Sequence, residues 1–166
     1  MNLTIPRPSS HQAASQTIRL LAARPAQAKS PAARWAANIL AVAGAALLVW
    51  SGVIHLQLWS DGYRSISVIG PLFLLQGIGS IVLAVILALF RRLVLMAAGA
   101  VTLAATAAGL LLSASIGLFG YTESLAVPYA ETSLVVEFAG AAVLVMAAAV
   151  VLATRLTKKS PQKQSF

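Results

Sequence analysis

Four long apolar runs, separated by short polar stretches, dominate this sequence. They cover residues 35–58, 69–90, 93–119 and 132–156. A helix that rises about 1.5 Å per residue needs roughly 20 residues to cross a hydrocarbon core about 30 Å thick. Each run reaches that length, and the third exceeds it, which implies a tilted helix or an end that lies in the interface. The pattern therefore predicts four transmembrane helices.

The same pattern excludes a transmembrane β-barrel. Barrel strands are about 9–11 residues long and alternate strictly between apolar and polar side chains, and the apolar runs show no such alternation. The expected fold class is an all-α membrane protein, a four-transmembrane-helix antiparallel bundle. Because only residues 91–92 separate the second run from the third, we expect those two helices to be antiparallel neighbours.

Two basic segments flank the predicted bundle, which occupies residues 34–156. Residues 1–33 contain four prolines, many Ser, Ala and Gln residues, and no acidic residue. Prolines interrupt helices and Ala buries little apolar surface, so this segment is predicted to be a disordered, basic cytoplasmic tail. An organellar transit peptide is the less favoured alternative for it. Residues 157–166 are predicted to form a second basic cytoplasmic tail.

The composition agrees with lipid as the main solvent of the chain. Of the 166 residues, 59% are hydrophobic and 10% are charged, whereas soluble domains have about 45–50% apolar and about 25% charged residues. A soluble fold of this size would leave too much of that apolar surface exposed. The chain has no cysteine, which excludes disulfides, thiolate metal sites and thiol catalysis.

The basic residues lie almost entirely on one side of the predicted bundle. All twelve Lys and Arg residues except Arg64 fall before the first run, between the second and third, or at the end of the fourth and after it. Loops rich in Lys and Arg stay in the cytoplasm, so we expect both termini to be cytoplasmic and the protein to lie in the inner (plasma) membrane. Topology thus accounts for the net charge of +8 without a nucleic-acid partner. The lipid bilayer is the expected partner.

Polar residues inside the predicted spans are candidates for function, because ionisable groups are costly in hydrocarbon. His55 and Glu137 are the two ionisable residues there, and Gln76, Ser113 and Ser115 lie at a similar depth near the outer ends of their runs. We predict that these five form one outward-facing polar cluster. The favoured interpretation is structural: hydrogen bonds between helices, worth about 0.6 kcal/mol each, hold the outer halves of the helices together. The alternative is a site for a ligand, an ion or a proton.

The outer loop between the first and second runs carries the densest pattern of polar residues. Asp61, Tyr63 and Arg64 are its candidate functional residues. Asp61 and the glycine after it signal a turn, and Arg64 can pair with an acidic residue on this side, although exposed pairs contribute little. No metal site is expected, because one His and one Glu are too few ligands. No cofactor is expected either, since axial haem ligation by paired histidines would need a second intramembrane His.

One stretch of the chain resembles a known group. Residues 54–76 read IHLQLWSDGYRSISVIGPLFLLQ, and this string resembles a segment of small four-helix integral membrane proteins of actinobacteria. The high Ala content and the basic, proline-containing N-terminal segment are similar to that group too. The resemblance implies a bacterial inner-membrane location. It implies no activity, substrate, cofactor or functional residue.

Motifs of the common catalytic classes are absent: the sequence contains no HExxH, GxSxG, Walker loop or CxxC. Short loops and many small residues in the spans favour helix packing. We therefore expect a non-enzymatic accessory or structural membrane subunit, with another membrane protein or a second copy of the chain as partner. The alternative is a small transporter or channel component that uses His55 and Glu137 as a binding or coupling pair.

Overall fold

The computed structural model describes residues 30–126 and 128–156. Within these residues four helices are long and apolar enough to cross a membrane, and one short 3-10 helix precedes the second of them. The elements are α2 (Pro31–Ser60), η2 (Tyr63–Ser65), α3 (Ile69–Phe90), α4 (Leu93–Ile116) and α5 (Ala130–Leu156). No β-strand occurs in the described part of the chain. The expected all-α class with four long apolar helices is confirmed. Both predicted tails, apart from residues 30–33, lie outside the described residues.

Several helix ends differ from the bounds expected from hydropathy. Helix α2 begins at Pro31 rather than at residue 35, since a proline in the first turn loses no helical hydrogen bond. Helix α4 ends at Ile116 rather than at residue 119. Gly117 follows it with a φ of 79°, in the region that favours glycine, and its N–H donates to the carbonyl oxygen of Ser113. The apolar residues just after Gly117 therefore belong to a loop.

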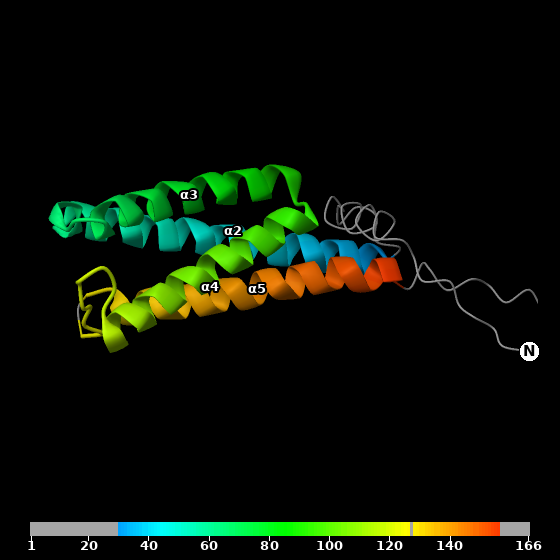
Figure 1. Cartoon of the computed structure of the whole chain (residues 1–166). Coiled ribbons are helices and arrows are strands. Elements are labelled where there is room, and N and C mark those ends of the chain that lie inside the picture. Colours follow the sequence, from blue (N-terminus) through cyan, green and yellow to red (C-terminus); the bar gives the residue numbers. More distant parts are fainter. Residues whose placement is uncertain (1–29, 127, 157–166) are drawn as a thin grey trace, which may run out of the picture.

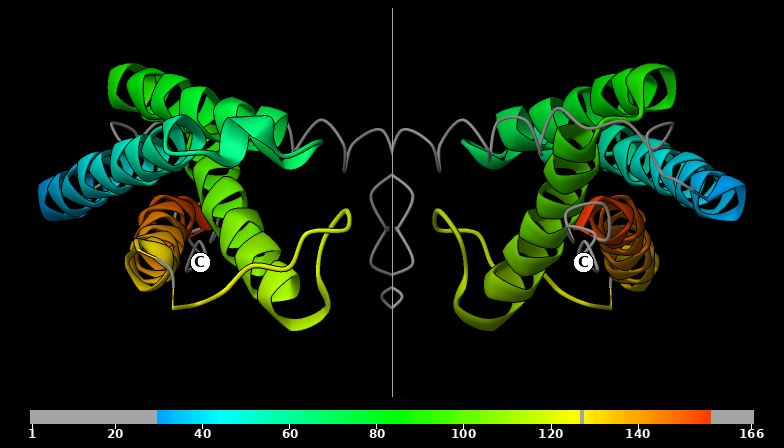
Figure 2. Two further views of the ribbon diagram at one scale, coloured as in Figure 1. Left: turned by 90° about the vertical axis from the view of Figure 1, so that its left-hand side faces the viewer. Right: turned by 90° about the vertical axis from the view of Figure 1, so that its right-hand side faces the viewer.

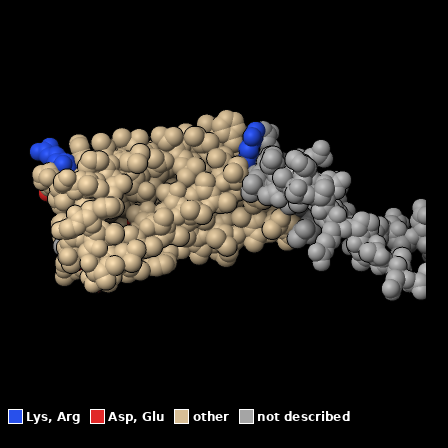
Figure 3. Space-filling view, viewed as in Figure 1, with Lys and Arg blue, Asp and Glu red and all other residues tan. Residues whose placement is uncertain are grey.

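Successive helices run in opposite directions, so the two ends of the bundle differ (Figure 1). One end carries the start of α2, the α3–α4 turn and the end of α5, and we call it the terminal end. The other carries η2 and the α4–α5 loop, and we call it the loop end. In Figure 3 the coloured Lys and Arg atoms of the visible face lie at these two ends, with a long uncharged surface between them. A surface of that kind suits the hydrocarbon core of a bilayer.

The helices pack side by side in the order α3, α2, α5, α4. Helix α2 lies against both α3 and α5, and α4 lies against α5. Helices α3 and α4 are close at the turn that joins them and diverge toward the loop end (Figures 1 and 2). The expectation that these two are neighbours therefore holds only near Arg91 and Arg92.

Glycines set these pairings. A Cβ added at Gly52 of α2 would lie 2.8 Å from the carbonyl oxygen of Gly77 of α3, so the two backbones are in direct contact. Gly44 of α2 accommodates the side chain of Leu144 of α5, and Gly140 of α5 accommodates side chains of α4 and α2. In lipid, such close approach is a main source of helix association. No described glycine packs α3 against α4 in this way.

The apolar core extends from the terminal end to the middle of the bundle. Its largest fully buried side chains come from all four helices: Leu48, Leu87, Met96, Leu103 and Leu144. Toward the loop end several buried side chains are polar instead. The bundle thus has an apolar half and a half that contains buried polar groups, and the candidate site lies in the second.

Candidate functional site

Glu137 of α5 is fully buried and lies at the centre of the polar half. Its Oε1 accepts hydrogen bonds from Ser133 Oγ at 2.8 Å and from Ser51 Oγ at 3.3 Å. Its Oε2 is buried and has no hydrogen-bond partner among the described residues. A buried carboxyl oxygen without a partner is costly, and native structures hold few of them. Glu137 is therefore the residue that most needs an explanation.

Helical periodicity brings these groups together. Ser133 and Glu137 are four residues apart on α5, and Ser51 and His55 are four apart on α2, so each pair shares one face of its helix. Helices α2 and α5 pack against each other, which places the two faces in contact. By a helical rise of about 1.5 Å per residue, Glu137 lies about 10 Å from the start of α5 and His55 about 8 Å from the end of α2. Both therefore lie at one level near the loop end.

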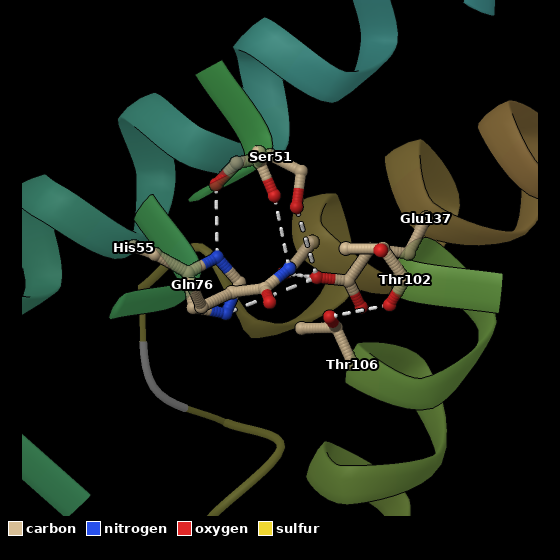
Figure 4. Close-up of polar contacts among 8 residues, drawn as sticks. Ser51, His55, Gln76, Thr102, Thr106 and Glu137 are labelled. Carbon is tan, nitrogen blue, oxygen red and sulfur yellow. Dashed lines mark hydrogen bonds and ion pairs between the residues drawn. The ribbon is translucent and has the colours of Figure 1, made fainter. Parts of the chain in front are cut away.

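His55 is buried beside Glu137. Its Nδ1 donates a 2.8 Å hydrogen bond to the carbonyl oxygen of Ser51, and because a carbonyl oxygen only accepts, Nδ1 carries the proton. Its Nε2 lies 4.0 Å from Glu137 Oε1, which is too long for a direct hydrogen bond. Figure 4 shows the imidazole ring, Ser51 and the Glu137 carboxyl group facing one another. The arrangement leaves a short gap between the two ionisable groups.

A cavity of about 480 Å³ adjoins this cluster. Residues of all four helices and both loops of the loop end line it, and His55 and Glu137 belong to its wall. Most of the wall is apolar; its larger apolar contributors include Leu72, Phe73, Val101, Leu110 and Phe119. The volume falls within the range of about 300–1,000 Å³ that is typical of small-molecule sites. The divergence of α3 and α4 toward the loop end creates the space.

Aromatic and acidic residues of the two loops cover the cavity at the loop end. The Tyr63 hydroxyl donates a 2.7 Å hydrogen bond to Glu123 Oε2, and Glu123 Oε1 accepts from the backbone N–H of Ser124 at 2.9 Å. The Tyr63 ring stacks on Phe73 with centroids 4.7 Å apart and meets Tyr121 edge-on at 5.9 Å. Burial in these contacts raises the pKa of Tyr63, and the hydrogen bond to Glu123 raises it further. The phenol is therefore held in its protonated, donating form.

The structure brings together most of the predicted polar cluster around one cavity. His55, Gln76, Ser113 and Glu137 all line it. Gln76 lines the cavity, but its Nε2 donates a 3.1 Å hydrogen bond to Ser80 Oγ of its own helix and not to Glu137. Figure 4 shows Gln76 beside His55, with Glu137 across from them.

The two serines of α4 have different surroundings. Ser113 is buried, lines the cavity and donates a 3.4 Å hydrogen bond to the carbonyl oxygen of Tyr121. Ser115 is exposed, lies outside the cavity wall and donates to the carbonyl oxygen of Leu112 at 3.2 Å. Residues two positions apart project from different faces of a helix, so only one of the two can face the bundle interior.

The candidate residues of the first outer loop also separate. Tyr63 turns inward to the cavity, whereas Asp61 and Arg64 are exposed at the loop end. Within the described part of the chain Arg64 makes no ion pair. Of these three residues, only Tyr63 belongs to the site.

Sequence reasoning missed Ser51 and Ser133, the two hydroxyl donors to Glu137. A signal for them does exist, because His55 and Glu137 each have a serine four positions before them, on the same helical face. Thr102 and Thr106 of α4 were not among the candidate site residues, yet both line the cavity; Thr106 Oγ1 donates to the carbonyl oxygen of Thr102 at 2.8 Å (Figure 4).

The donor set limits the chemistry of the site. The described residues contain no group of three His, Cys, Asp or Glu side chains that could hold a metal ion. What the site offers is a buried carboxyl group with one free oxygen, an imidazole nitrogen beside it, and a mostly apolar wall. These are the elements of a binding site for a molecule with one polar group and an apolar body.

Comparison of the chain with protein-family models, with curated proteins and with solved structures gave no match.

Proposed function

We propose that this chain is a multi-pass membrane protein that binds a small amphipathic molecule, as a small transporter or as the binding component of one. The observation that carries the proposal is the fully buried, unpaired carboxyl oxygen of Glu137 in the wall of a mostly apolar cavity. A molecule with a polar head and an apolar body would satisfy that oxygen and fill the cavity at once.

The divergence of α3 and α4 supports entry of this molecule from the lipid. The two helices separate toward the loop end, and the cavity lies where they separate. The contact between Tyr63 and Glu123 covers the cavity at the loop end itself. Leu72 of α3 and Val101 of α4 line the cavity and are exposed. An amphipathic molecule that has partitioned into the bilayer would reach the cavity at these side chains, without passing that cover.

The proposed location is the inner (plasma) membrane of a bacterium, with the terminal end in the cytoplasm. Arg34, Arg91 and Arg92 all lie at the terminal end, whereas Arg64 lies at the loop end. Positively charged loops stay in the cytoplasm. In that orientation the cavity opens in the outer half of the bilayer. The resemblance of residues 54–76 to actinobacterial membrane proteins supports a bacterial membrane.

We favour a transporter over the accessory or structural subunit that the sequence alone led us to expect. For packing alone, an apolar side chain at position 137 would serve at lower cost than a buried carboxyl group with one unpaired oxygen. The cavity beside it is likewise unnecessary for packing, because bundles of this size pack closely without one. A binding role accounts for both features.

Native mass spectrometry of the protein purified in a mild detergent tests the proposal. The wild-type protein should retain a small molecule, and Glu137→Gln should lose it while keeping its helical circular dichroism spectrum. The matched control is Glu131→Gln, which removes an exposed carboxyl group from the first turn of the same helix and should retain the molecule. A wild-type protein that carries a stoichiometric protein partner and no small molecule would contradict the proposal and favour the accessory subunit.

A further inference from the structure

The ionisable groups around the cavity share one character. Two carboxyl residues, Glu123 and Glu137, line it together with His55, and its wall among the described residues includes no Lys or Arg. Arg64, the basic residue of the loop end, is exposed and outside the wall. Low-dielectric walls focus the field of a buried carboxylate. The cavity therefore favours a cation over an anion.

The two carboxyl groups differ in their capacity for a ligand. Both oxygens of Glu123 are occupied, Oε2 by the Tyr63 hydroxyl and Oε1 by the backbone N–H of Ser124. Glu137 has both of its hydrogen bonds on Oε1 and none on Oε2. A ligand would therefore bind at Glu137, with Glu123 adding negative potential from the cover of the cavity.

The three side chains that contact Glu137 already use their hydrogen-bond donors. Nδ1 of His55 already donates to a backbone carbonyl oxygen, so Nε2 of the neutral ring can only accept. The hydroxyl groups of Ser51 and Ser133 both point to Oε1. On α4 the Thr106 hydroxyl donates to its own helix. With Glu137 ionised, its Oε2 and His55 Nε2 are thus unpaired acceptors on two neighbouring side chains, whose Oε1 and Nε2 atoms lie 4.0 Å apart. A ligand that pairs with these acceptors must bring an N–H or O–H donor.

The aromatic residues of the cavity suit a cation with a flat apolar body. Phe73 lies between His55 and Tyr63, with ring centroids 5.1 Å from the first and 4.7 Å from the second. Tyr121 of the α4–α5 loop continues this row, with its ring centroid 5.9 Å from that of Tyr63. Aromatic faces attract cations and pack against other rings. The row extends from the polar cluster to the cover of the cavity, so a ligand with its head at Glu137 would lie along it.

On the basis of the proposed function, we infer that the ligand is a lipophilic amine bound in its ammonium form with at least one N–H. Its ammonium group lies between Glu137 Oε2 and His55 Nε2, and its hydrocarbon body lies against the apolar wall of α3 and α4. Both the positive charge and an N–H donor are required. A quaternary ammonium has the charge without the donor, an alcohol has the donor without the charge, and a carboxylate has neither.

Four probes that share one naphthalene ring test this inference. They are 1-naphthylmethylammonium, its N,N,N-trimethyl derivative, 1-naphthylmethanol and the carboxylate 1-naphthaleneacetate. Binding is measured at neutral pH by naphthalene fluorescence, on the full chain in phosphatidylcholine nanodiscs, after subtraction of the signal from empty nanodiscs. The primary ammonium should bind about tenfold or more tightly than each of the others, as expected for a charge-assisted hydrogen bond. Glu137→Gln should remove this advantage, and Glu131→Gln should keep it.

Each contrary outcome has its own meaning. Equal binding of the ammonium and the alcohol would overturn the inference of a cation, and equal binding of the primary and quaternary ammonium would overturn the need for an N–H. Tightest binding by the acetate would contradict the charge argument. All three outcomes would leave the proposed function intact, whereas no saturable binding of any probe would contradict that function itself. The ranking uses the unmodified chain, so the test stands even if Glu137→Gln fails to fold.

Discussion

The hydroxyl of Tyr63 donates a 2.7 Å hydrogen bond to Oε2 of Glu123, which joins two loops that lie 60 positions apart in the sequence. The same ring stacks on Phe73 of α3, and Phe73 in turn lies 5.1 Å from the His55 ring. One aromatic side chain thus connects the cover of the cavity to the polar cluster below it. This relationship gives the loop end a testable structural role.

The first prediction concerns this hydrogen bond. Tyr63→Phe keeps the ring and its stacking but removes the donor, so one carboxyl oxygen of the buried Glu123 loses its partner. The free energy of unfolding should fall by about 1–2 kcal/mol, measured by denaturation in mixed micelles. Tyr129→Phe, which removes the hydroxyl of an exposed tyrosine of the α4–α5 loop, is the matched control. Equal effects of the two variants would show that the contact with Glu123 contributes no stability.

The second prediction concerns pH. Burial and the hydrogen bond to Glu123 raise the pKa of Tyr63 in the folded protein. A group whose pKa is raised by folding stabilises the fold fully below its unfolded pKa, which is about 10 for tyrosine, and loses this contribution as the pH rises beyond that value. The stability difference between wild type and Tyr63→Phe should therefore be constant from about pH 7 to about pH 9 and shrink above about pH 10. A difference that grows with rising pH would have the wrong sign for a raised pKa.

The third prediction concerns the cavity. Gly109 lines it, and a Cβ added there meets no atom within 4 Å, so Gly109→Phe should fill the space without a clash. Binding of 1-naphthylmethylammonium should weaken about tenfold or more. Gly79 of α3 has the same open surroundings but does not line the cavity, so Gly79→Phe should leave binding unchanged. Unchanged binding in Gly109→Phe would place the ligand elsewhere.

The fourth prediction concerns the hydroxyl groups near Glu137. Ser133→Ala removes the 2.8 Å hydrogen bond to a fully buried carboxyl oxygen and should lower the free energy of unfolding by about 1–2 kcal/mol. Ser115→Ala removes an exposed hydroxyl that bonds only within its own helix and should change it by less than about 0.5 kcal/mol. Chemical denaturation of the two variants checks the difference. The reverse order would show that the hydrogen bond between Ser133 and Glu137 contributes less to stability than the exposed hydroxyl of Ser115.

The fifth prediction concerns the contact between α2 and α3. A Cβ at Gly52 would lie 2.8 Å from the backbone oxygen of Gly77, which cannot rotate away as a side chain can. Gly52→Val should therefore push the two helices apart and cost about 1–3 kcal/mol. Gly79→Val on the open face of α3 should be neutral or slightly stabilising, because it removes a glycine from a helix. Resistance to unfolding by sodium dodecyl sulfate distinguishes the two.

The sequence by itself determined the number of long helices and their approximate bounds. A helix has a constant rise per residue, so the length of an apolar run shows whether it can cross a membrane as a helix. The same rise predicted that five polar residues lie at one level. In the structure His55, Gln76, Ser113 and Glu137 line one cavity, and Ser115 does not. Depth along a spanning helix is thus readable from position alone. The end of α4 was misplaced because the residues after Gly117 are apolar, and hydropathy does not report backbone conformation.

Only the tertiary structure decided which faces of the helices meet. In a soluble helix the apolar face marks the interior, but in lipid both faces are apolar, so hydropathy cannot tell Ser113, which is buried, from Ser115, which is exposed. Close contacts at glycines pack α3 against α2 and α4 against α5. The hydropathy of the chain does not show that α3 and α4 then diverge. The cavity, the unpaired oxygen of Glu137 and the contact between Tyr63 and Glu123 all follow from that divergence and from side-chain packing across distant parts of the chain.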